Sequence, residues 1–434
     1  MLKEKINNNN SEELIEVLHL PVEIENGKTY VINQPNPNSY THSYFKYPCK
    51  FIPELPRWAL NKYITKSNEN VLDPFSGSGT TLLEANLKGL NAYGTEIDSF
   101  AKLLIKVKTT LLDIPEINYI KKWIKNLISS YKDSFKDYED PFVPQINNLY
   151  HWFPEENVQK LGLIKKEISK VENQRIADFL KVCLASSVRK CSYADDVSPK
   201  PYVSKKIKKV PSDPFIIYPT VVEKYLQLMN EFVMHSRTNS IGNTELLNGD
   251  ALNINTDLKF NIAITSPPYI NAFDYVRTLR LENLWLNLES EDTLRRKKKD
   301  YVGTENIKVK IEEEDLSILK LSDELRDIYY RIEAVDKKRA VIVKKFFEDM
   351  RQNLLEVKDV LVDGGKYCIV IGDSTIRKVH VKSWKIISDI AISEGYELDT
   401  YFSYIIQNHY LRIPRGKRGG KINKDYVFVL KKSN

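Results

Sequence analysis

The sequence predicts an α/β protein with a mainly parallel, seven-stranded sheet, a C-terminal antiparallel hairpin and a large helical insertion. Three observations support this class. A strand, a glycine turn, a helix and a second strand follow one another between residues 70 and 96. Short apolar runs typical of strands return after residue 245, and the segment from about 99 to 237 has mainly helical apolar spacing. A chain of 434 residues, 42% of them hydrophobic, can bury a sizeable core.

The first βαβ unit is the clearest local signal. Residues 70–73 form a short apolar strand that enters a glycine turn, and residues 80–88 have the apolar spacing of a helix. Gly89 should end that helix, because glycine readily adopts the left-handed conformation that follows a helix. Residues 91–96 then form a second strand that ends in an acid, which completes the unit.

The second half of the chain continues the alternation of strands and helices. Gly364 and Gly365 should end the helix that we predict at 341–360. A glycine-rich basic loop separates the last two strands, which we expect to pair as a hairpin. The predicted elements are strands at 245–248, 260–265, 366–372, 397–406 and 426–430, with helices at 341–360 and 381–393.

Composition excludes several classes of protein. No apolar stretch reaches the ~18 residues of a membrane span, and the polar start lacks the apolar core of a signal peptide, so we expect no membrane association and a cytoplasmic protein. The four cysteines are too few and too scattered for a disulfide framework, and no Cys-x-x-Cys pair with partner histidines suggests zinc. We therefore expect reduced thiols and no metal.

The net charge of +7 is compatible with nucleic-acid binding. Basic clusters lie at 205–209, 295–299 and 412–418, and any of them could contact phosphates. Each cluster taken alone is more typical of a solvated surface than of a phosphate-binding site.

The glycine turn at 73–81 indicates a cofactor site, because glycine lets backbone N–H groups approach a ligand. No Gly-Lys-Ser/Thr sequence closes the turn, which argues against a phosphate-binding P-loop. Asp73 and the missing third glycine argue against a dinucleotide. A cationic, phosphate-free cofactor such as S-adenosylmethionine fits better. Glu96 could accept hydrogen bonds from its ribose. Asp250, which we expect at the end of the third strand, could accept from its adenine, although it could equally cap a helix.

The segment Ser266-Pro267-Pro268-Tyr269 follows a predicted strand and so lies at the carboxyl edge of the sheet, where ligands bind in such folds. A base amine is a poor nucleophile, because its lone pair is delocalised into the ring. An enzyme must therefore hold it with hydrogen-bond acceptors. The prolines stiffen the turn, the serine hydroxyl and a proline carbonyl can accept, and the tyrosine can stack on an extruded base. A turn with a buried tyrosine is the alternative.

Together these motifs resemble the DNA amino-methyltransferases, which make N4-methylcytosine or N6-methyladenine in bacterial restriction-modification systems. The resemblance covers residues 40–107, 245–288 and 340–431, and it implies a Rossmann-like fold, S-adenosylmethionine and double-stranded DNA with a flipped target base. It implies that residues 47–53 close over the methionine end of the cofactor. The implied cofactor-binding residues are Phe51, Asp73, Pro74, Phe75, Ser76, Gly77, Gly79, Thr80, Thr81, Glu96, Asp250 and Ala251, and the implied catalytic residues are Ser266, Pro267, Pro268 and Tyr269.

The resemblance also gives the chain a domain plan and a substrate. Serine before Pro-Pro-Tyr is usual in the cytosine-N4 enzymes of this family, so Ser266 favours cytosine, and a cognate restriction endonuclease is an expected partner. Candidate DNA contacts are Arg277, Arg412, Arg415, Lys417 and Arg418. The expected segments are a polar extension (1–39), the cofactor-binding half (40–107), a helical insertion with a candidate target-recognition role (108–240) and the second catalytic half (241–434) with a charged insert near 289–338.

Three other functions stay open on the sequence. Adenine-N6 methylation of DNA is the nearest alternative. Transfer to guanine N2 of tRNA is a second, since those enzymes use a similar Pro-Pro-Tyr turn. A nucleic-acid-binding protein that has kept the fold without activity is a third, and the intact acids and intact tetrapeptide argue against it.

Overall fold

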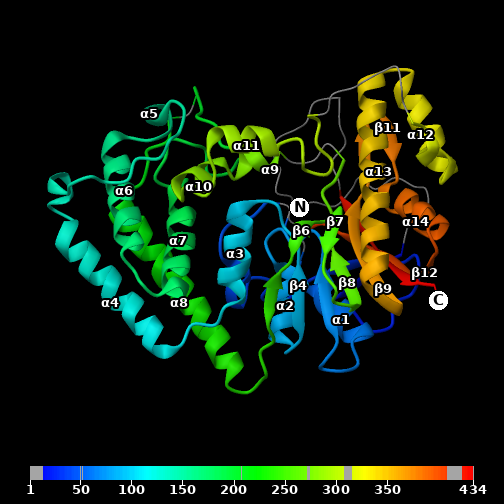
Figure 1. Ribbon diagram of the computed structural model, residues 1–434, viewed down its shortest axis with the longest axis horizontal. Helices are drawn as coiled ribbons and strands as arrows, with labels where there is room; N and C mark the ends of the chain where they lie inside the picture. The colour runs from blue at the N-terminus through cyan, green and yellow to red at the C-terminus, as the bar shows by residue number, and fades with distance from the viewer. Residues whose placement is uncertain are drawn as a thin grey trace, which may run out of the picture.

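A mixed, mainly parallel sheet forms the centre of the molecule (Figure 1). The computed structural model describes residues 13–48, 50, 52–206, 208–270, 274–306, 315–407 and 423–433. Nine strands pair in the order β1-β2-β12-β13-β9-β8-β3-β4-β5. They are β1 (Leu14–Val17), β2 (Thr29–Ile32), β3 (Asn70–Asp73), β4 (Asn91–Gly94), β5 (Thr244–Leu246), β8 (Phe260–Thr265), β9 (Leu361–Gly372), β12 (Tyr396–Ile405) and β13 (Lys424–Lys432).

The strand directions confirm the predicted fold class. Only β13 runs antiparallel to its neighbours β12 and β9, and the other pairs in this sheet are parallel. The seven predicted strands are all present, and the C-terminal pair is the expected antiparallel hairpin. Two further strands, β1 and β2, extend the sheet beyond β12.

Helices cover both faces of the sheet and give it two separate cores. One core contains Trp58, Leu82 and Ile105, packed on one face of the strands. The opposite face packs against residues such as Phe347 and Ile387. The helices on the first face are α1 (Glu54–Tyr63), α2 (Thr80–Leu87) and α3 (Ser99–Thr109), and those on the second are α13 (Lys337–Val360) and α14 (Ser383–Ser393).

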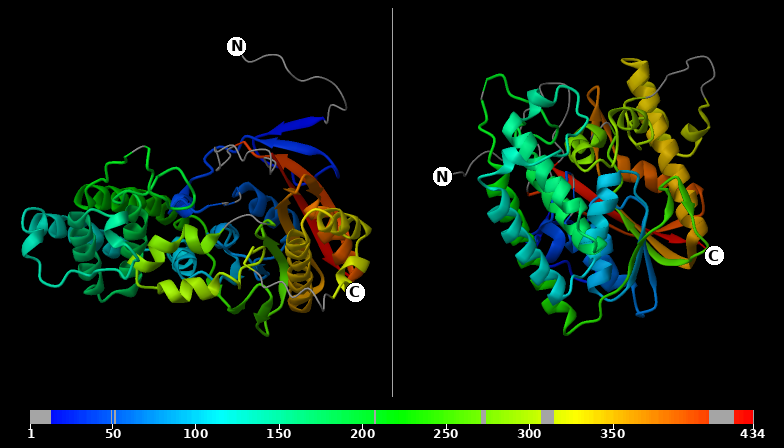
Figure 2. Two further views of the ribbon diagram at one scale, coloured as in Figure 1. Left: turned by 90° about the horizontal axis from the view of Figure 1, so that it is seen from above. Right: turned by 60° about the vertical axis from the view of Figure 1, so that its left-hand side comes forward.

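The helical insertion forms a lobe to one side of the sheet, with a core of its own (Figures 1 and 2). Asp113 begins it with a capping box, because its carboxylate accepts from the Glu116 N–H while Glu116 bonds back to Asp113. The helices of the lobe are α4 (Ile114–Tyr131), α5 (Leu149–Trp152), α6 (Glu155–Ser169), α7 (Gln174–Val188) and α8 (Pro214–Ser236).

Smaller elements surround the carboxyl end of the sheet. The charged insert after residue 288 is largely helical, and two short hairpins lie outside the main sheet. These elements are η1 (Tyr40–Ser43), β6 (Asn248–Asp250), β7 (Asn253–Asn255), α9 (Tyr275–Thr278), α10 (Arg280–Trp285), α11 (Glu291–Lys297), η3 (Ser317–Lys320), α12 (Asp323–Glu333), β10 (Ser374–Ile376) and β11 (Val379–Val381).

The structure corrects three details of the predicted elements. The N-terminal extension, for which we predicted no strand, supplies β1 and β2. Gly364 and Gly365 do not end a helix. They lie inside β9, where the pairing register with β8 jumps between Leu361 and Lys366, and Gly364 has a φ of 70°. Asp250 is on the β6–β7 hairpin rather than at the end of the third strand, because β5 already ends at Leu246.

Two findings concern the composition. In the part of the chain that the structure describes, no helix is long and apolar enough to cross a membrane. Cys183, Cys191 and Cys368 are free and buried, as expected of reduced thiols, and Cys49 lies outside the described residues.

Candidate active site

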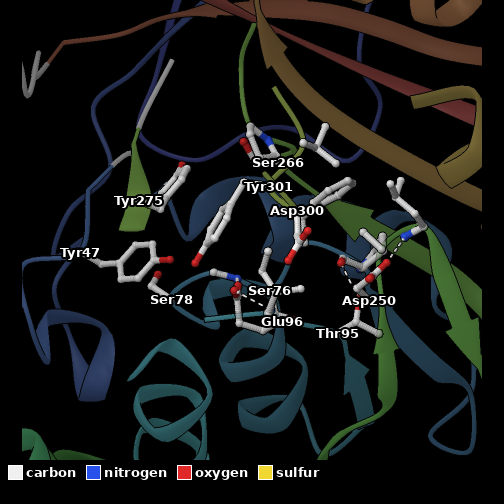
Figure 3. Close-up of a pocket in the computed structure, with 18 of the residues that line it drawn as sticks. Tyr47, Ser76, Ser78, Thr95, Glu96, Asp250, Ser266, Tyr275, Asp300 and Tyr301 are labelled. Atoms are coloured by element: carbon white, nitrogen blue, oxygen red, sulfur yellow. Dashed lines mark hydrogen bonds between the residues drawn. The ribbon is translucent and has the colours of Figure 1, made fainter. Parts of the chain in front are cut away.

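The glycine turn after β3 lines a pocket at the carboxyl end of the sheet (Figure 3). Gly77 and Gly79 have φ values of 49° and 75°, in the left-handed region that favours glycine. The Ser76 hydroxyl donates to the Asp73 carbonyl at 2.8 Å, and the Ser76 N–H donates to the Thr95 carbonyl at 3.1 Å. These bonds fix the turn between the ends of β3 and β4.

Asp73 stabilises this turn through hydrogen bonds. Its side chain is only 1% exposed and accepts the Thr265 hydroxyl at 2.6 Å and the Phe75 N–H at 3.2 Å. Burial raises the pKa of Asp73 to about 6, and the hydrogen bonds from Thr265 and Thr81 oppose that rise. Asp73 therefore joins β3 to β8 and holds the turn, and it is not part of the pocket lining.

Glu96 is the acid that closes the turn. Its carboxylate accepts backbone N–H groups from Gly77, Ile97 and Asp98, each at 2.8 Å. Burial raises the pKa of Glu96 to about 7, although these three donors favour the ionised form. The carboxylate lines the pocket directly beside the turn (Figure 3).

Two further acids face the same pocket. Asp250 accepts the Leu252 N–H at 2.7 Å, which fixes the turn of the β6–β7 hairpin, and the Ala251 carbonyl accepts from Asn353 at 2.7 Å. Asp300 comes from the charged insert after α11 and is exposed. With Glu96 they give the pocket three carboxylates, which favours a cationic ligand.

The Ser-Pro-Pro-Tyr segment begins where β8 ends, and it divides into two parts. Ser266 and Pro268 line the pocket, whereas Pro267 and Tyr269 are not part of its lining. The Tyr269 hydroxyl donates to Asp425 Oδ1 at 2.7 Å, and the Tyr404 hydroxyl donates to Asp425 Oδ2 at 2.8 Å. Asp425 is 5% exposed, and burial raises its pKa. The position of Tyr269 is thus set by the C-terminal hairpin.

Three tyrosines form an aromatic wall at the other side of the pocket (Figure 3). The rings of Tyr47 and Tyr275 are stacked with centroids 6.2 Å apart, and those of Tyr275 and Tyr301 with centroids 6.1 Å apart. The Tyr301 hydroxyl also donates to Asp98, the N-cap of α3, at 3.2 Å. Residues from three segments of the sequence therefore form one stack of aromatic rings beside the pocket.

A buried polar cluster on α2 holds the segment that carries Tyr47. Glu84 accepts from His42 at 2.8 Å and from both Nε and Nη2 of Arg57, at 3.0 and 2.8 Å. Lys50 lines the pocket and donates to the His42 carbonyl at 2.9 Å, and burial lowers its pKa to about 8. Glu84 thereby anchors the residues that flank the pocket entrance.

The pocket has an empty volume of about 800 Å³, which includes space open to solvent. Of the predicted residues, those in its lining are Pro74, Phe75, Ser76, Gly77, Thr80, Glu96, Asp250, Ala251, Ser266 and Pro268. Five of the predicted cofactor-binding and catalytic residues that the structure describes are not part of this lining: Asp73, Gly79, Thr81, Pro267 and Tyr269.

Several predicted residues lie elsewhere. Phe51 and the basic residues Arg412, Arg415, Lys417 and Arg418 fall outside the described residues. Arg277 is exposed on α9, two residues after Tyr275 of the aromatic wall. Among the residues that the structure describes, no group of three or more His, Cys, Asp and Glu side chains could hold a metal ion.

Comparison with known proteins finds similarity to DNA methylases. Residues 3–107 match N6_N4_Mtase, described as DNA methylase, and this range includes the glycine turn and Glu96. The Type II methyltransferase M.MvaI of Kocuria varians is 25% identical over 95% of this chain and 93% of its own length. M.AvaI of Nostoc sp., also a Type II methyltransferase, is 22% identical over 92% of this chain and 88% of its own. The chain is thus similar to this DNA methylase family over residues 3–107, and to both Type II methyltransferases over most of its length.

A shorter similarity reaches an RNA enzyme. The tRNA (guanine(10)-N2)-dimethyltransferase of Methanocaldococcus jannaschii is 32% identical over 24% of this chain and 27% of its own. The similarity to the two Type II methyltransferases extends over most of each chain. The similarity to the tRNA enzyme is limited to about a quarter of this chain.

The structure adds pocket residues that the sequence did not single out. Tyr47 and Tyr275 belong to segments with a family resemblance, so a signal for them was present. Asp300 and Tyr301 lie in the charged insert near 289–338, which has no motif of its own. Only the folding of the chain brings them to the pocket. The other additions are Lys50, Ser78, Thr95, Ile97, Leu252 and Val302.

Proposed function

We propose that this chain is an S-adenosylmethionine-dependent DNA methyltransferase that methylates the N4 amino group of cytosine in duplex DNA, as the modification enzyme of a restriction-modification system. One observation carries the proposal. A single pocket brings together the glycine turn, Glu96, Asp250 and the Ser266–Pro268 segment. The names of its Type II relatives support the biological setting.

The lining residues suit the proposed cofactor. S-Adenosylmethionine carries a sulfonium and an ammonium group, and the carboxylates of Glu96, Asp250 and Asp300 all face the pocket. Lys50 is the lysine of the lining and suits the cofactor carboxylate. In this proposal Glu96 accepts from the ribose hydroxyls and Asp250 from the adenine amine.

Ser266 and the prolines would act on the target base. When bound, S-adenosylmethionine supplies an electrophilic methyl group. The Ser266 hydroxyl and a proline carbonyl of the turn would accept hydrogen bonds from the cytosine amine, which draws its lone pair out of conjugation with the ring. The stiff Pro-Pro turn keeps these acceptors in place, so little reorganisation is needed. Serine rather than an acid or amide at this position supports cytosine as the target.

Methylation of duplex DNA with labelled S-adenosylmethionine, followed by nucleoside analysis, tests the proposal. We expect label in N4-methylcytosine. Ser266→Ala should lower kcat by about a hundredfold, because it removes an acceptor that acts on the reacting amine, with little change in cofactor affinity. Label only in N6-methyladenine would reassign the base. Label in tRNA but not in DNA would replace the proposal with the activity of the RNA relative.

A further inference from the structure

The loop between α7 and α8 has a defined shape although it contains almost no regular structure. An isolated antiparallel bridge joins Ala194 to Val203, and the Asp195 N–H donates to the Tyr202 carbonyl at 2.9 Å. Asp195 also accepts the N–H groups of Val197 and Ser198, at 2.9 and 2.6 Å, which forms a turn. Residues 195–206 and 208–210 therefore form a defined loop, which we call the lysine loop.

Two cationic side chains hold the lysine loop at its base. Arg189 donates to the carbonyls of Ser198 and Pro199, at 2.8 and 3.0 Å. Lys209 donates to the carbonyls of Arg189 and Ala194 at 2.8 and 2.9 Å, and pairs with Asp196 at 2.7 Å. Bonds of this kind fix the loop before any ligand arrives, so binding would cost little ordering entropy.

The part of the lysine loop that follows the bridge at Val203 carries unbalanced positive charge. Lys205, Lys206 and Lys208 are exposed, and none forms an ion pair with a residue in the described part of the chain. Tyr202 and Val210 are also exposed, at 40% and 87%. Three neighbouring lysines repel one another, so the arrangement is best suited to contact with a polyanion.

The other basic clusters of the sequence differ from this loop. In the cluster at 295–299, Lys297 pairs with Glu289, and Lys298 pairs with Asp274 at 2.5 Å. Arg295 lies 3.5 Å from Asp292 on the same helix. Much of that charge is therefore neutralised, and the cluster at 412–418 lies outside the described residues. Arg296 and Lys299 of that cluster are exposed without an ion pair to a described residue, so of the two clusters that can be compared the lysine loop keeps more charge, three lysines against two cations.

The lysine loop is connected to the pocket through α9. Arg189 donates not only to the loop but also to the carbonyl of Thr278, at 3.3 Å. Thr278 is the last residue of α9, and Tyr275, its first residue, belongs to the aromatic wall. Figure 1 shows the loop projecting from the top of the helical lobe, at the same end of the molecule as α5 and α9.

We propose that the lysine loop binds the phosphate backbone of duplex DNA beside the target base, and that Arg189 sets its position relative to the pocket. The inference rests on the proposed function, because it assigns the surface that holds the same DNA. It gives the helical insertion a role in substrate binding. Lys205, Lys206 and Lys208 would each approach a phosphate, which contributes affinity without reading sequence.

Charge reversal at the lysine loop tests this surface against a matched control. The loop variant is Lys205→Glu/Lys206→Glu/Lys208→Glu. The control is Lys121→Glu/Lys122→Glu/Lys125→Glu, which changes the net charge equally on the exposed face of α4. Affinity for a 30-base-pair duplex is measured by fluorescence anisotropy across a salt series. S-Adenosylhomocysteine binding, measured by calorimetry, reports whether each variant is folded.

We expect the loop variant to lose at least tenfold in duplex affinity, and the slope of log affinity against log salt to become shallower by roughly two to three units. The control should lose much less, and both variants should bind S-adenosylhomocysteine as the wild type does. Equal losses in the two variants, or wild-type affinity in the loop variant, would overturn the inference. If the wild type methylates duplex DNA in that case, the proposed function stands alone. Label in tRNA together with no duplex binding would overturn both.

Discussion

At the scale of single residues, Tyr269 shows how the reaction could depend on a side chain outside the pocket. Its hydroxyl and that of Tyr404 both donate to Asp425. Asp425→Asn keeps one acceptor oxygen and presents an amide donor to the other phenol, so Tyr269 should lose its fixed orientation. We expect kcat to fall by roughly ten- to a hundredfold in single-turnover methylation assays, with cofactor affinity unchanged.

Asp399→Asn is the matched control, because Asp399 lies on β12 and accepts a comparable bond from Tyr63 at 2.7 Å. Its position on the sheet is separate from the pocket lining. A similar fall in kcat in both variants would mean that loosening the hairpin, rather than freeing Tyr269, lowers the rate.

Glu96 should make the affinity for the cofactor depend on pH. Burial raises the pKa of Glu96 to about 7, so the carboxylate takes up a proton as the pH falls through neutrality. Protonation removes an acceptor that the ribose hydroxyls would use. Cofactor affinity should therefore be full above the pKa and should weaken by about tenfold between pH 8 and pH 6. Calorimetric titration with S-adenosylhomocysteine over this range measures it.

The variant Glu96→Gln shows whether the pH dependence comes from Glu96 or from another group that titrates nearby, such as Asp73. The variant should bind more weakly at pH 8 and lose most of the pH dependence between 6 and 8. An unchanged pH profile in Glu96→Gln would assign the dependence to a different group.

At the scale of elements, α2 is fixed to its neighbours by Glu84, which accepts from both His42 and Arg57. Glu84→Ala leaves His42 buried without this partner. Removing one member of a buried ionic cluster is costly, and since Arg57 is 31% exposed we expect a loss of about 2–3 kcal/mol in the free energy of unfolding. Urea denaturation followed by circular dichroism measures it.

The segment of Tyr47 and Lys50 should loosen as well, so S-adenosylhomocysteine should bind more weakly to Glu84→Ala. Asp327→Ala provides the comparison, since its pair with Arg331 on α12 is exposed on both sides. That substitution should cost less than about 0.5 kcal/mol. Equal losses in the two variants would contradict the anchoring role of Glu84.

At the scale of the whole molecule, β1 and β2 protect one edge of the sheet. They bury Leu20, Tyr30 and Ile32, and β2 pairs with β12 at Ser403 and Tyr404. Deletion of residues 1–35 should expose the edge of β12 and this apolar surface. We expect Tm to fall by roughly 5 °C or more, together with concentration-dependent association. Scanning fluorimetry and analytical ultracentrifugation measure the two effects, and a monomeric protein of unchanged Tm would contradict this role.

The sequence was informative where the signals are local. The strand, glycine turn and helix from residue 70 to 88 and the acid at Glu96 depend on neighbours in the chain, and their placement was predictable. Tyr269 differs, because its partner Asp425 is 156 residues away. Asp300 and Tyr301 reach the pocket only through tertiary packing.

The misread elements have local causes too. Gly364-Gly365 after a long amphipathic pattern looks like a helix end, yet α13 passes straight into β9 at Leu361. The strands β1 and β2 have four residues each, which is too short for apolar alternation to distinguish them from loops. Asp250 was expected to end a strand, but the chain turns into a separate hairpin first.

The position of β2 also determines when the fold can be completed. Its partner in the sheet besides β1 is β12, which is synthesised more than 360 residues later. During translation β1 and β2 must therefore wait, unpaired with the sheet, until almost the whole chain has left the ribosome. Contacts between such distant segments form slowly, because a long loop must close first. In pulsed hydrogen exchange during refolding, the amides of β1 and β2 should gain protection after those of β3, β4 and β8.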